Sequence, residues 1–258
     1  MFANVKTGID VLERKGFSLF NKQRVGLIIN PSSVNRNLES TLEVFLRNGV
    51  NVTALFAPEH GLRGALQDQE KFMSFKDDKN GIPAYSLYGK HLAPTQDMLE
   101  NVDVLVFDIQ DIGARYYTFI WTMGLAMEKA TQYDKRFVVL DRPNPINGID
   151  IEGPLLCKGY ESFVGLYPIP IRHGMTTGEL ALLFKDEFGI CVGLDIVKMR
   201  GWSRKLWFDE TGLRWVSPSP NMVTLDTATV YPGMCLLEGT NISEGRGTTK
   251  PFEYFGAP

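Results

Sequence analysis

The sequence predicts an α/β fold in which a parallel sheet carries helices on both faces. Short apolar segments rich in Val, Ile and Leu recur along about the first 200 residues, and segments with helical spacing lie between them. Polar and turn-forming residues follow the apolar segments. A strand–helix–strand order that repeats in this way is typical of parallel sheets, because each crossover returns the chain to the same edge.

Strands are expected where β-branched and other apolar residues cluster between turn formers. These segments cover residues 24–30, 50–56, 82–88, 102–109, 137–140 and 194–199. The segment at residues 24–30 ends in a turn at residues 30–33, and the segment at residues 102–109 ends in a polar stretch that begins at Asp108.

Helices are expected where apolar residues recur at intervals of three and four positions. The pattern covers residues 38–48, 94–100, 117–127 and 176–188. Leu38 opens the first of these helices and Gly49 stops it, whereas Tyr117 opens the third. Thr176 and Glu179 have the spacing of a capping box, in which each side chain accepts from the backbone of the other residue, and this predicts the start of the last helix.

The remaining segments are expected to be irregular. Residues 68–80 are polar and predict a surface loop, and residues 144–172 are rich in Pro and Gly and predict a long ordered connection. After residue 199 the chain is loop-rich, with a turn at residues 231–233. We therefore expect one domain, with a loop-rich tail that can belong to a second.

Charge and hydropathy exclude several classes of partner. The net charge is -3 and the Lys and Arg residues form no stripe, so neither nucleic acid nor an anionic membrane is an expected partner. No apolar run approaches the roughly 20 residues needed to cross a bilayer, so no membrane insertion is expected. The first residues show no basic region followed by an apolar core, which predicts a cytoplasmic location for the chain as it stands.

The cysteine and histidine residues predict neither disulfides nor a metal site. Cys157, Cys191 and Cys235 are an odd number, lie far apart and have apolar neighbours, which predicts buried free thiols. A nucleophilic or metal-binding cysteine is the alternative. The three histidines are also far apart, so few residues are available to build a zinc site, and no metal is expected.

Polar side chains follow four of the predicted strands. They are Asn30, Glu59, His60, Asp108, Gln110, Arg142 and Asn144. The carboxyl ends of parallel strands meet at one edge of the sheet, and ligands of open α/β sheets bind in the crevice beyond that edge. We therefore expect these side chains to converge on one site.

Glu59 and His60 are the first candidates for chemistry. Glu59 can act as a general acid or as a nucleophile, and the alternative is a surface carboxylate or a helix cap. His60 can orient Glu59, bind a substrate oxygen or serve as a structural histidine. A place at the end of a strand favours a functional role, but the residues alone leave both interpretations open.

The loop after residue 108 offers further polar contacts. Asp108 and Asp111 bracket a turn, where they can supply a second carboxylate, bind hydroxyl groups or cap the turn itself. Arg115 can hold an anionic group by a forked contact or pair with Asp111. Beside it, the ring of Tyr116 can form a platform for the apolar face of a sugar.

The later loops add cations and glycines but no nucleotide motif. His173 precedes the capping box, near a helix N-terminus where the dipole disfavours protonation of the ring. Glu244 and Arg246 lie in a glycine-rich loop, whose backbone can approach a ligand closely. This loop lacks the Lys-Ser/Thr ending of a phosphate-binding loop, and no Gly-x-Gly-x-x-Gly turn follows the first strand. No nucleotide or other cofactor is therefore expected.

Eight segments, taken in order along the chain, resemble a known family. They are residues 25–31, 56–64, 107–118, 141–148, 172–176, 217–222, 238–241 and 243–253. The second contains Pro58-Glu59-His60-Gly61, and the sixth contains Ser217-Pro218-Ser219-Pro220-Asn221. On these segments the chain resembles the bacterial exo-β-N-acetylmuramidases of the NamZ type, long described as a domain of unknown function.

The resemblance implies a Rossmann-like catalytic domain over residues 1–222 and a smaller domain after it, with the active site in the cleft between them. It implies a glycosidase that releases N-acetylmuramic acid from the non-reducing ends of peptidoglycan fragments, with no metal or organic cofactor. Glu59 matches the proposed catalytic glutamate of the family, and His60 is its neighbour in the motif.

The resemblance also suggests partners for Glu59 and for the substrate. Asp108 or Glu244 is the expected second carboxyl group. Muramic acid carries a lactyl carboxylate, which calls for a cationic side chain. The candidate cations are Arg115, Arg142, Arg172 and Arg246.

Members of this family usually continue past residue 258. We therefore expect residues 223–258 to be the start of a truncated C-terminal domain. Many members carry an export signal, which we do not expect in this chain. The alternative to an active glycosidase is a non-catalytic protein that binds cell-wall sugars in the same cleft.

Overall fold

The computed structural model describes residues 3–62, 75–76 and 79–257. Within them, seven strands form one sheet in the order β3-β4-β2-β1-β5-β6-β7. The strands are β1 (Val25–Ile29), β2 (Val52–Ala57), β3 (Phe75–Lys76), β4 (Pro83–Ser86), β5 (Val104–Asp108), β6 (Arg136–Leu140) and β7 (Gly193–Val197). Neighbouring strands are parallel except β3 and β4, which pair antiparallel. The predicted parallel sheet is confirmed.

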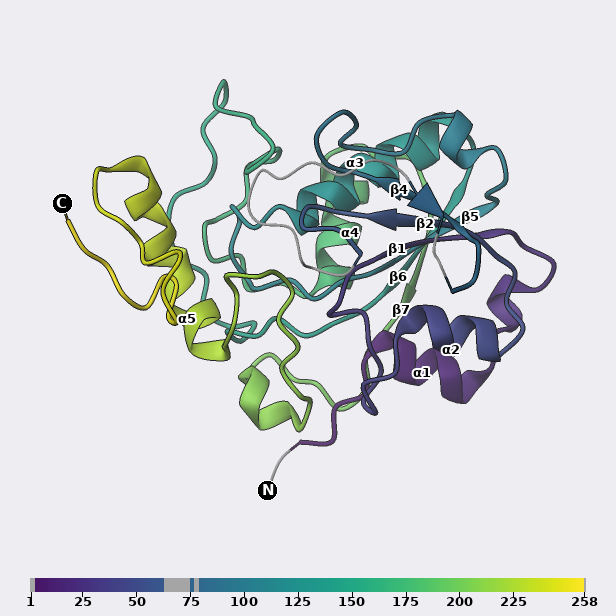
Figure 1. Ribbon diagram of the computed structural model, residues 1–258, viewed down its shortest axis with the longest axis horizontal. Coiled ribbons are helices and arrows are strands. Elements are labelled where there is room, and N and C mark those ends of the chain that lie inside the picture. The colour runs from purple at the N-terminus through teal and green to yellow at the C-terminus, as the bar shows by residue number, and fades with distance from the viewer. Residues whose placement is uncertain (1–2, 63–74, 77–78, 258) are drawn as a thin grey trace.

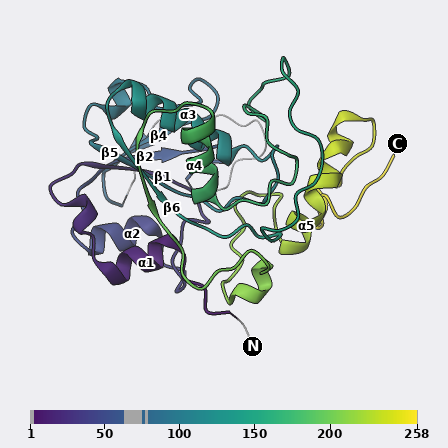
Figure 2. The same ribbon diagram turned by 180° about the vertical axis from the view of Figure 1, so that it is seen from behind.

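Helices cover both faces of the sheet (Figure 1 and Figure 2). One face carries α1 (Gly8–Lys15) and α2 (Thr41–Arg47), and the other carries α3 (Phe119–Gln132) and α4 (Thr177–Glu187). Neighbouring residues of β1 enter different cores, because Leu27 packs with α1 and α2 whereas Ile28 packs with α3 and α4. This burial on both sides explains why β1 is apolar throughout instead of alternating.

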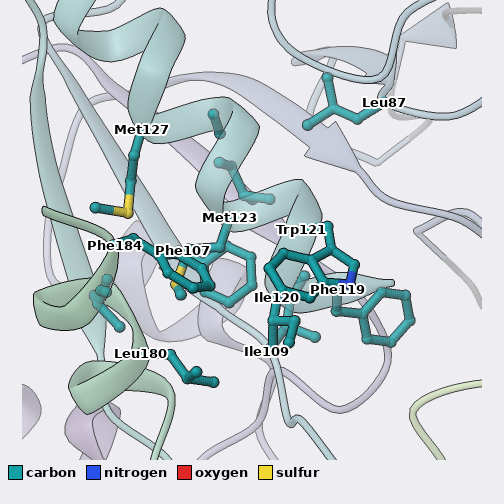
Figure 3. Packing of buried hydrophobic residues seen from close by; sticks show 14 of the residues in the cluster. Leu87, Phe107, Ile109, Phe119, Ile120, Trp121, Met123, Met127, Leu180 and Phe184 are labelled. Atoms are coloured by element: carbon teal, nitrogen blue, oxygen red, sulfur yellow. The ribbon is translucent and has the colours of Figure 1, made fainter. Parts of the chain in front are cut away.

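The larger core lies between the sheet, α3 and α4 (Figure 3). Trp121 from α3 stacks on Phe184 from α4, with ring centroids 5.6 Å apart and planes at 20°. Phe107 of β5 and Leu180 of α4 are buried in the same cluster. These apolar contacts hold α3 against the sheet, and the residues just before α3 are thereby held at the carboxyl edge.

Caps, rather than apolar spacing, set where the helices begin. α2 starts after Ser40, whose hydroxyl accepts from the backbone N–H of Glu43. Leu38 lies before this helix with a φ of 64° and an exposed fraction of 42%, so its predicted place in the helix is wrong. α3 begins at Phe119, so Tyr117 also precedes its helix. The predicted capping box of α4 is confirmed.

Two helices differ more strongly from the sequence prediction. The pattern does not predict α1, which begins with a capping box of Thr7 and Asp10. It also does not predict α5 (Leu225–Met234), because Pro232 and Gly233 indicate a turn. The predicted turn is wrong: α5 continues through Pro232 to Met234, and the packing of Tyr231 against Tyr117 and Phe252 offsets the hydrogen bond that proline cannot donate. The described helices include none that is long and apolar enough to cross a bilayer.

Shorter elements complete the description. The 3₁₀ segments are Ser18–Phe20, Asp97–Leu99, Phe208–Thr211 and Cys235–Gly239. The helix predicted at residues 94–100 is therefore a single 3₁₀ turn. The loop predicted at residues 68–80 is wrong at Phe75–Lys76, which form β3. Its residues 68–74 and 77–78 lie outside the described residues, as do Arg63 and Gly64 of the second resembling segment.

The three cysteines are free, but their predicted burial is wrong. Cys157 and Cys191 are exposed, and Cys235 is half-buried. Cys157 and Cys191 lie in irregular segments, where neighbours in sequence do not share a buried face, and Cys235 opens a 3₁₀ segment in which no residue is buried, so apolar sequence neighbours misled the prediction.

Candidate active site

A pocket of about 230 Å³ lies between the loops at the strand ends and the C-terminal segment. Figure 1 shows α5 and the C-terminus together at one end of the molecule, apart from the sheet. One wall comes from the loop after β2, the start of α3 and residues 219–222, and the other comes from α5 and the chain that follows it. The polar lining residues are Glu59, His60, Tyr88, Tyr116, Tyr117, Thr118, Ser219, Asn221, Tyr231, Glu238 and Arg246.

Glu59 brings its carboxyl group to this pocket from the loop that follows β2. The residue is 7% exposed. Thr118 Oγ1 donates a hydrogen bond of 2.9 Å to Glu59 Oε2. Because Thr118 is the N-cap residue of α3, this helix holds one carboxylate oxygen in place. A carboxyl group fixed in this way beside a pocket suits proton transfer to a bound ligand or attack on it.

His60 lines the same pocket in an unusual backbone conformation. Its φ is 71°, in the left-handed region that residues other than glycine adopt rarely. The turn is closed by the Gly61 N–H, which donates to the Pro58 carbonyl over 3.1 Å. Strained positions of this kind cluster at functional sites. The structure therefore brings the predicted Glu59–His60 pair to the pocket.

Asp108 is placed in the interior of the protein, not in the pocket. It is the last residue of β5 and is fully buried. Arg142 donates hydrogen bonds to both of its carboxylate oxygens, from Nε to Oδ1 over 2.6 Å and from Nη2 to Oδ2 over 3.0 Å. Thr41 Oγ1 also donates to Asp108. The expected convergence of Asp108 and Arg142 on Glu59 is wrong, because their charges are satisfied by each other inside the fold.

Asn30 and Gln110 hold loops rather than line the pocket. Asn30 Nδ2 donates to the Pro218 carbonyl over 3.1 Å. This bond ties the loop at residues 217–222, which supplies Ser219 and Asn221, to the end of β1. Gln110 Nε2 donates to the Asp111 carbonyl over 2.7 Å and to the Pro143 carbonyl over 2.8 Å. Their contribution to the site is therefore indirect.

Asn144 and His173 are likewise part of the supporting structure. Asn144 Oδ1 accepts from the Ile146 N–H over 3.1 Å and caps the turn after β6. His173 Nδ1 accepts from the Met175 N–H over 3.2 Å, which leaves the ring proton on Nε2. That nitrogen faces Asp111 Oδ2 at 3.1 Å, and both side chains are buried.

Among the four candidate arginines, Arg246 lines the pocket. Arg115 Nη1 donates to the carbonyls of Pro154 and Ile169 over 2.7 and 2.6 Å, so its alternative pairing with Asp111 is wrong. Burial lowers the pKa of Arg115. Arg172 pairs with Asp150 and Glu152 at 3.2 and 2.9 Å. The carboxylates of these pairs are exposed, whereas the Arg172 side chain is 12% exposed and is held by these pairs away from the pocket lining.

Arg246 lies between two carboxylates. Its Nη2 is 2.8 Å from Glu238 Oε1, and its Nη1 is 3.3 Å from Glu244 Oε1. Glu238 lines the pocket, whereas Glu244 supports Arg246 from behind the lining. Tyr116 also lines the pocket, but its hydroxyl donates to the Pro232 carbonyl over 2.9 Å. Burial raises the pKa of Tyr116 to about 12.

The usual ligand crevice of this fold class is closed. The strand order reverses between β1 and β5, which is where open α/β sheets bind ligands. The hollow there, lined by Ser32, Gln110 and Arg142, measures about 20 Å³. This is space for about one water molecule. The pocket that holds Glu59 lies instead beyond β2, to one side of the reversal.

Several polar lining residues could not be found from strand ends. Thr118, Ser219, Asn221 and Glu238 do not follow a strand, so the topological argument cannot reach them. They lie within the segments that resemble the family, which is the signal that could have identified them. Among the residues that the structure describes, no three His, Cys, Asp or Glu side chains are grouped as ligands for a metal ion.

Comparison with known proteins identifies the family. The sequence model for the N-terminal part of exo-β-N-acetylmuramidase NamZ matches residues 25–226, and that for its C-terminal part matches residues 229–258. The peptidoglycan β-N-acetylmuramidase NamZ of Bacillus subtilis strain 168 is 55% identical over 255 residues, which are 98% of this chain and 62% of the relative. The chain thus spans less than two thirds of the length of this curated relative.

Two solved structures have the same fold. Both are DUF1343 family proteins of Bacteroides fragilis NCTC 9343. The first has a TM-score of 0.92 and 45% sequence identity, and the match covers 98% of this chain and 65% of that protein. The second has a TM-score of 0.85 and 34% identity, covering 99% and 68%. The chain belongs to the exo-β-N-acetylmuramidase NamZ family.

Proposed function

We propose that this chain forms the glycosidase part of an exo-β-N-acetylmuramidase, which releases N-acetylmuramic acid from the non-reducing ends of peptidoglycan fragments. The observation that carries the proposal is the carboxyl group of Glu59, held by Thr118 at the wall of a polar pocket. Membership of the NamZ family and the activity for which the Bacillus subtilis relative is named support the substrate class.

Glu59 is proposed to protonate the glycosidic oxygen or to attack the anomeric carbon. Most glycosidases use two carboxyl groups that flank the scissile bond. Asp108 is buried against Arg142, and Glu244 is not among the lining residues, so neither suits the second role. Glu238 lines the same pocket as Glu59, and we propose it as the second carboxyl group. Its ion pair with Arg246 favours the ionised form that a base or nucleophile needs.

The rest of the pocket suits a sugar with an anionic substituent. Tyr88 and Phe163 lie with ring centroids 6.1 Å apart on the pocket wall, where they offer a platform for an apolar sugar face. Arg246 is the proposed contact for the lactyl carboxylate of muramic acid, since a guanidinium group matches carboxylate geometry. His60 is proposed to bind a substrate oxygen or to orient Glu59.

We also propose a domain boundary close to residue 222. The family models for the two parts of NamZ meet between residues 226 and 229, which supports a boundary in this region. The pocket wall draws Glu59 from one side of the boundary and Glu238 from the other. The site would then be shared between the catalytic domain and the segment that follows it.

Hydrolysis of a chromogenic N-acetylmuramide by this chain tests the proposal. Glu59→Gln should lower kcat by about 10²–10⁴-fold, the usual contribution of a positioned acid or base. Glu238→Gln should lower kcat by a similar factor if it is the second carboxyl group. Glu43→Gln, on the surface of α2 and paired with Lys79, is the matched control and should leave kcat unchanged.

Three outcomes separate the possibilities. Equal rates for wild type and Glu59→Gln would exclude Glu59 as the catalytic residue. Loss of activity in Glu59→Gln with full activity in Glu238→Gln would retain the glycosidase and exclude Glu238. Binding of N-acetylmuramic acid without hydrolysis by the wild type would favour a non-catalytic sugar-binding protein.

A further inference from the structure

Tyr117 carries a buried hydroxyl group at the pocket wall. The residue is 7% exposed and lines the same pocket as Glu59. Among the described residues, no hydrogen bond of ordinary geometry reaches its hydroxyl oxygen. The Ser219 side chain lowers the pKa of this hydroxyl as a hydrogen-bonding neighbour does, but the contact does not meet ordinary hydrogen-bond geometry. A buried hydroxyl group without a partner destabilises the folded state, so this arrangement calls for an explanation.

The ring of Tyr117 is fixed by its aromatic neighbours. Phe119 meets it edge to face at a centroid distance of 4.8 Å and an angle of 68°. Tyr231 meets it at 5.9 Å and 81°. Both neighbours belong to helices, α3 and α5. These two contacts hold the ring in its orientation at the pocket wall.

The chemistry of this hydroxyl suits a neutral polar ligand atom. Burial raises the pKa of Tyr117, and the negative charges of Asp111 and Glu59 act in the same direction. The group therefore stays protonated and can donate a hydrogen bond at any physiological pH. The same two carboxylates disfavour an anion at this point, so the matching ligand atom is a neutral oxygen, as in a sugar hydroxyl or an acetamido carbonyl.

We propose that Tyr117 is a substrate-binding residue, whose hydroxyl donates a hydrogen bond to a neutral oxygen of the sugar held beside Glu59. This inference rests on the proposed glycosidase function and assigns a new contact within that site. The partner missing in the free protein is supplied by the ligand. Sugars that lack the matching oxygen leave the hydroxyl unpaired and bind more weakly, which gives the pocket part of its specificity.

The neighbouring tyrosine shows why this role falls to Tyr117. Tyr116 lies in the same pocket, but its hydroxyl is already bonded to the Pro232 carbonyl. Tyr167 offers a matched control outside the pocket. Its hydroxyl donates to Glu128 Oε1 over 2.6 Å, and its ring stacks on Phe188 at 4.4 Å.

The test compares Tyr117→Phe with Tyr167→Phe in this chain. Three quantities are measured: the unfolding temperature without ligand, its shift with N-acetylmuramic acid, and kcat/KM on a chromogenic N-acetylmuramide. Tyr117→Phe should unfold at the same temperature as the wild type or higher, because it removes an unpaired buried hydroxyl. Its ligand-induced shift should shrink, and kcat/KM should fall roughly tenfold, the effect of one lost hydrogen bond.

Tyr167→Phe should behave in the opposite way. It should lower the unfolding temperature, because it breaks a hydrogen bond within the protein, and should leave the ligand response unchanged. The inference is overturned if Tyr117→Phe lowers the ligand-free unfolding temperature as Tyr167→Phe does, or if its ligand response equals that of the wild type.

Failure of the proposed function gives a different result. In that case the wild type neither hydrolyses the muramide nor responds to N-acetylmuramic acid. The unfolding temperatures without ligand still show whether the Tyr117 hydroxyl is hydrogen-bonded within the protein. A lower unfolding temperature for Tyr117→Phe overturns the inference, and an equal or higher one supports a hydroxyl that faces a different hydroxylated ligand.

Discussion

Glu59 and Asp108 both lie near the carboxyl ends of parallel strands, yet only Glu59 reaches the pocket. Asp108 is still inside β5, in register with Ile29 of β1, so helices cover it from both faces. Glu59 lies two positions beyond the end of β2, where the chain has left the sheet. What differs is the position of each residue relative to the end of its strand. A side chain within the paired part of the strand is buried in the fold, whereas one that lies beyond it can reach the pocket.

The buried carboxyl group of Asp141 should make the stability of the protein depend on pH. Its carboxylate is 7% exposed and accepts from the Gly178 N–H over 2.8 Å. Burial raises its pKa from 3.8 to about 6, against the opposing effect of hydrogen bonds from Gly178 and Thr176. The folded protein thus binds this proton more tightly than the unfolded chain. Its contribution to stability is fully present below about pH 4 and is lost as the pH rises through about 6.

The variant Asp141→Asn isolates this effect. Asn keeps an oxygen for the Gly178 N–H but cannot ionise. Relative to the wild type, its free energy of unfolding should rise between pH 4 and pH 7 by roughly 3 kcal/mol, since one pKa unit is about 1.4 kcal/mol. Urea unfolding at several pH values measures the difference. Parallel pH profiles for the two proteins would show that Asp141 ionises normally in the fold.

At the scale of elements, close approach to the sheet distinguishes α1 from α5. A Cβ atom at Gly8, the first residue of α1, would lie 2.4 Å from the Asp141 backbone nitrogen. The Gly8 N–H also donates to the Asp141 carbonyl over 2.8 Å. Gly233 in α5 has no atom within 4 Å of a built Cβ. One glycine is required by packing, whereas the other is tolerated in an exposed helix.

Alanine at these two glycines should therefore act in opposite directions. Gly8→Ala should destabilise the protein by about 1–3 kcal/mol, because α1 has to move away from β6. Gly233→Ala should stabilise it by roughly 0.5–1 kcal/mol through helix propensity. Denaturant midpoints of the two variants provide the measurement. Destabilisation of similar size in both would mean that helix geometry, not contact with the sheet, limits these positions.

At the scale of the whole molecule, the Asp108–Arg142 pair joins distant parts of the chain. It connects β5 with the loop after β6, and Thr41 brings α2 to the same carboxylate. Arg142 Nη2 also donates to the Val34 carbonyl over 2.9 Å. This cluster fills the point of strand reversal, so the space that binds ligands in other proteins of this fold class serves here to hold the sheet edge together.

Breaking this pair should be costly. Asp108→Asn leaves the buried charge of Arg142 without a counter-charge, and should lower the free energy of unfolding by about 3–5 kcal/mol. Asp103→Asn is the matched control. Asp103 pairs with Arg24 at 2.7 Å, with side chains 33% and 41% exposed, so its loss should cost under about 1 kcal/mol. Equal losses in the two variants, measured by urea unfolding, would contradict a special role for the buried pair.

Local chemistry made much of the fold predictable. The apolar strands β1, β2, β5 and β6 are read directly from buried segments, and the capping box of α4 from Thr176 and Glu179. α5 could not be predicted, because Pro232 and Gly233 contradict the helix locally and tertiary contacts override them. Tyr231 from that helix packs against Tyr117 and Phe252, and these contacts favour the helical position.

The sequence by itself determined the α/β class and the positions of six of the seven described strands, and it made Glu59 the first candidate for catalysis, because these follow from burial patterns and from a motif read in order. The tertiary structure decided which charges remain available. It paired Asp108 with Arg142, engaged Arg115 with carbonyl groups, and left Glu59 at a pocket. The reason is physical: burial pattern is a local property of the chain, whereas the partner of a buried charge depends on which distant residue the fold brings within reach.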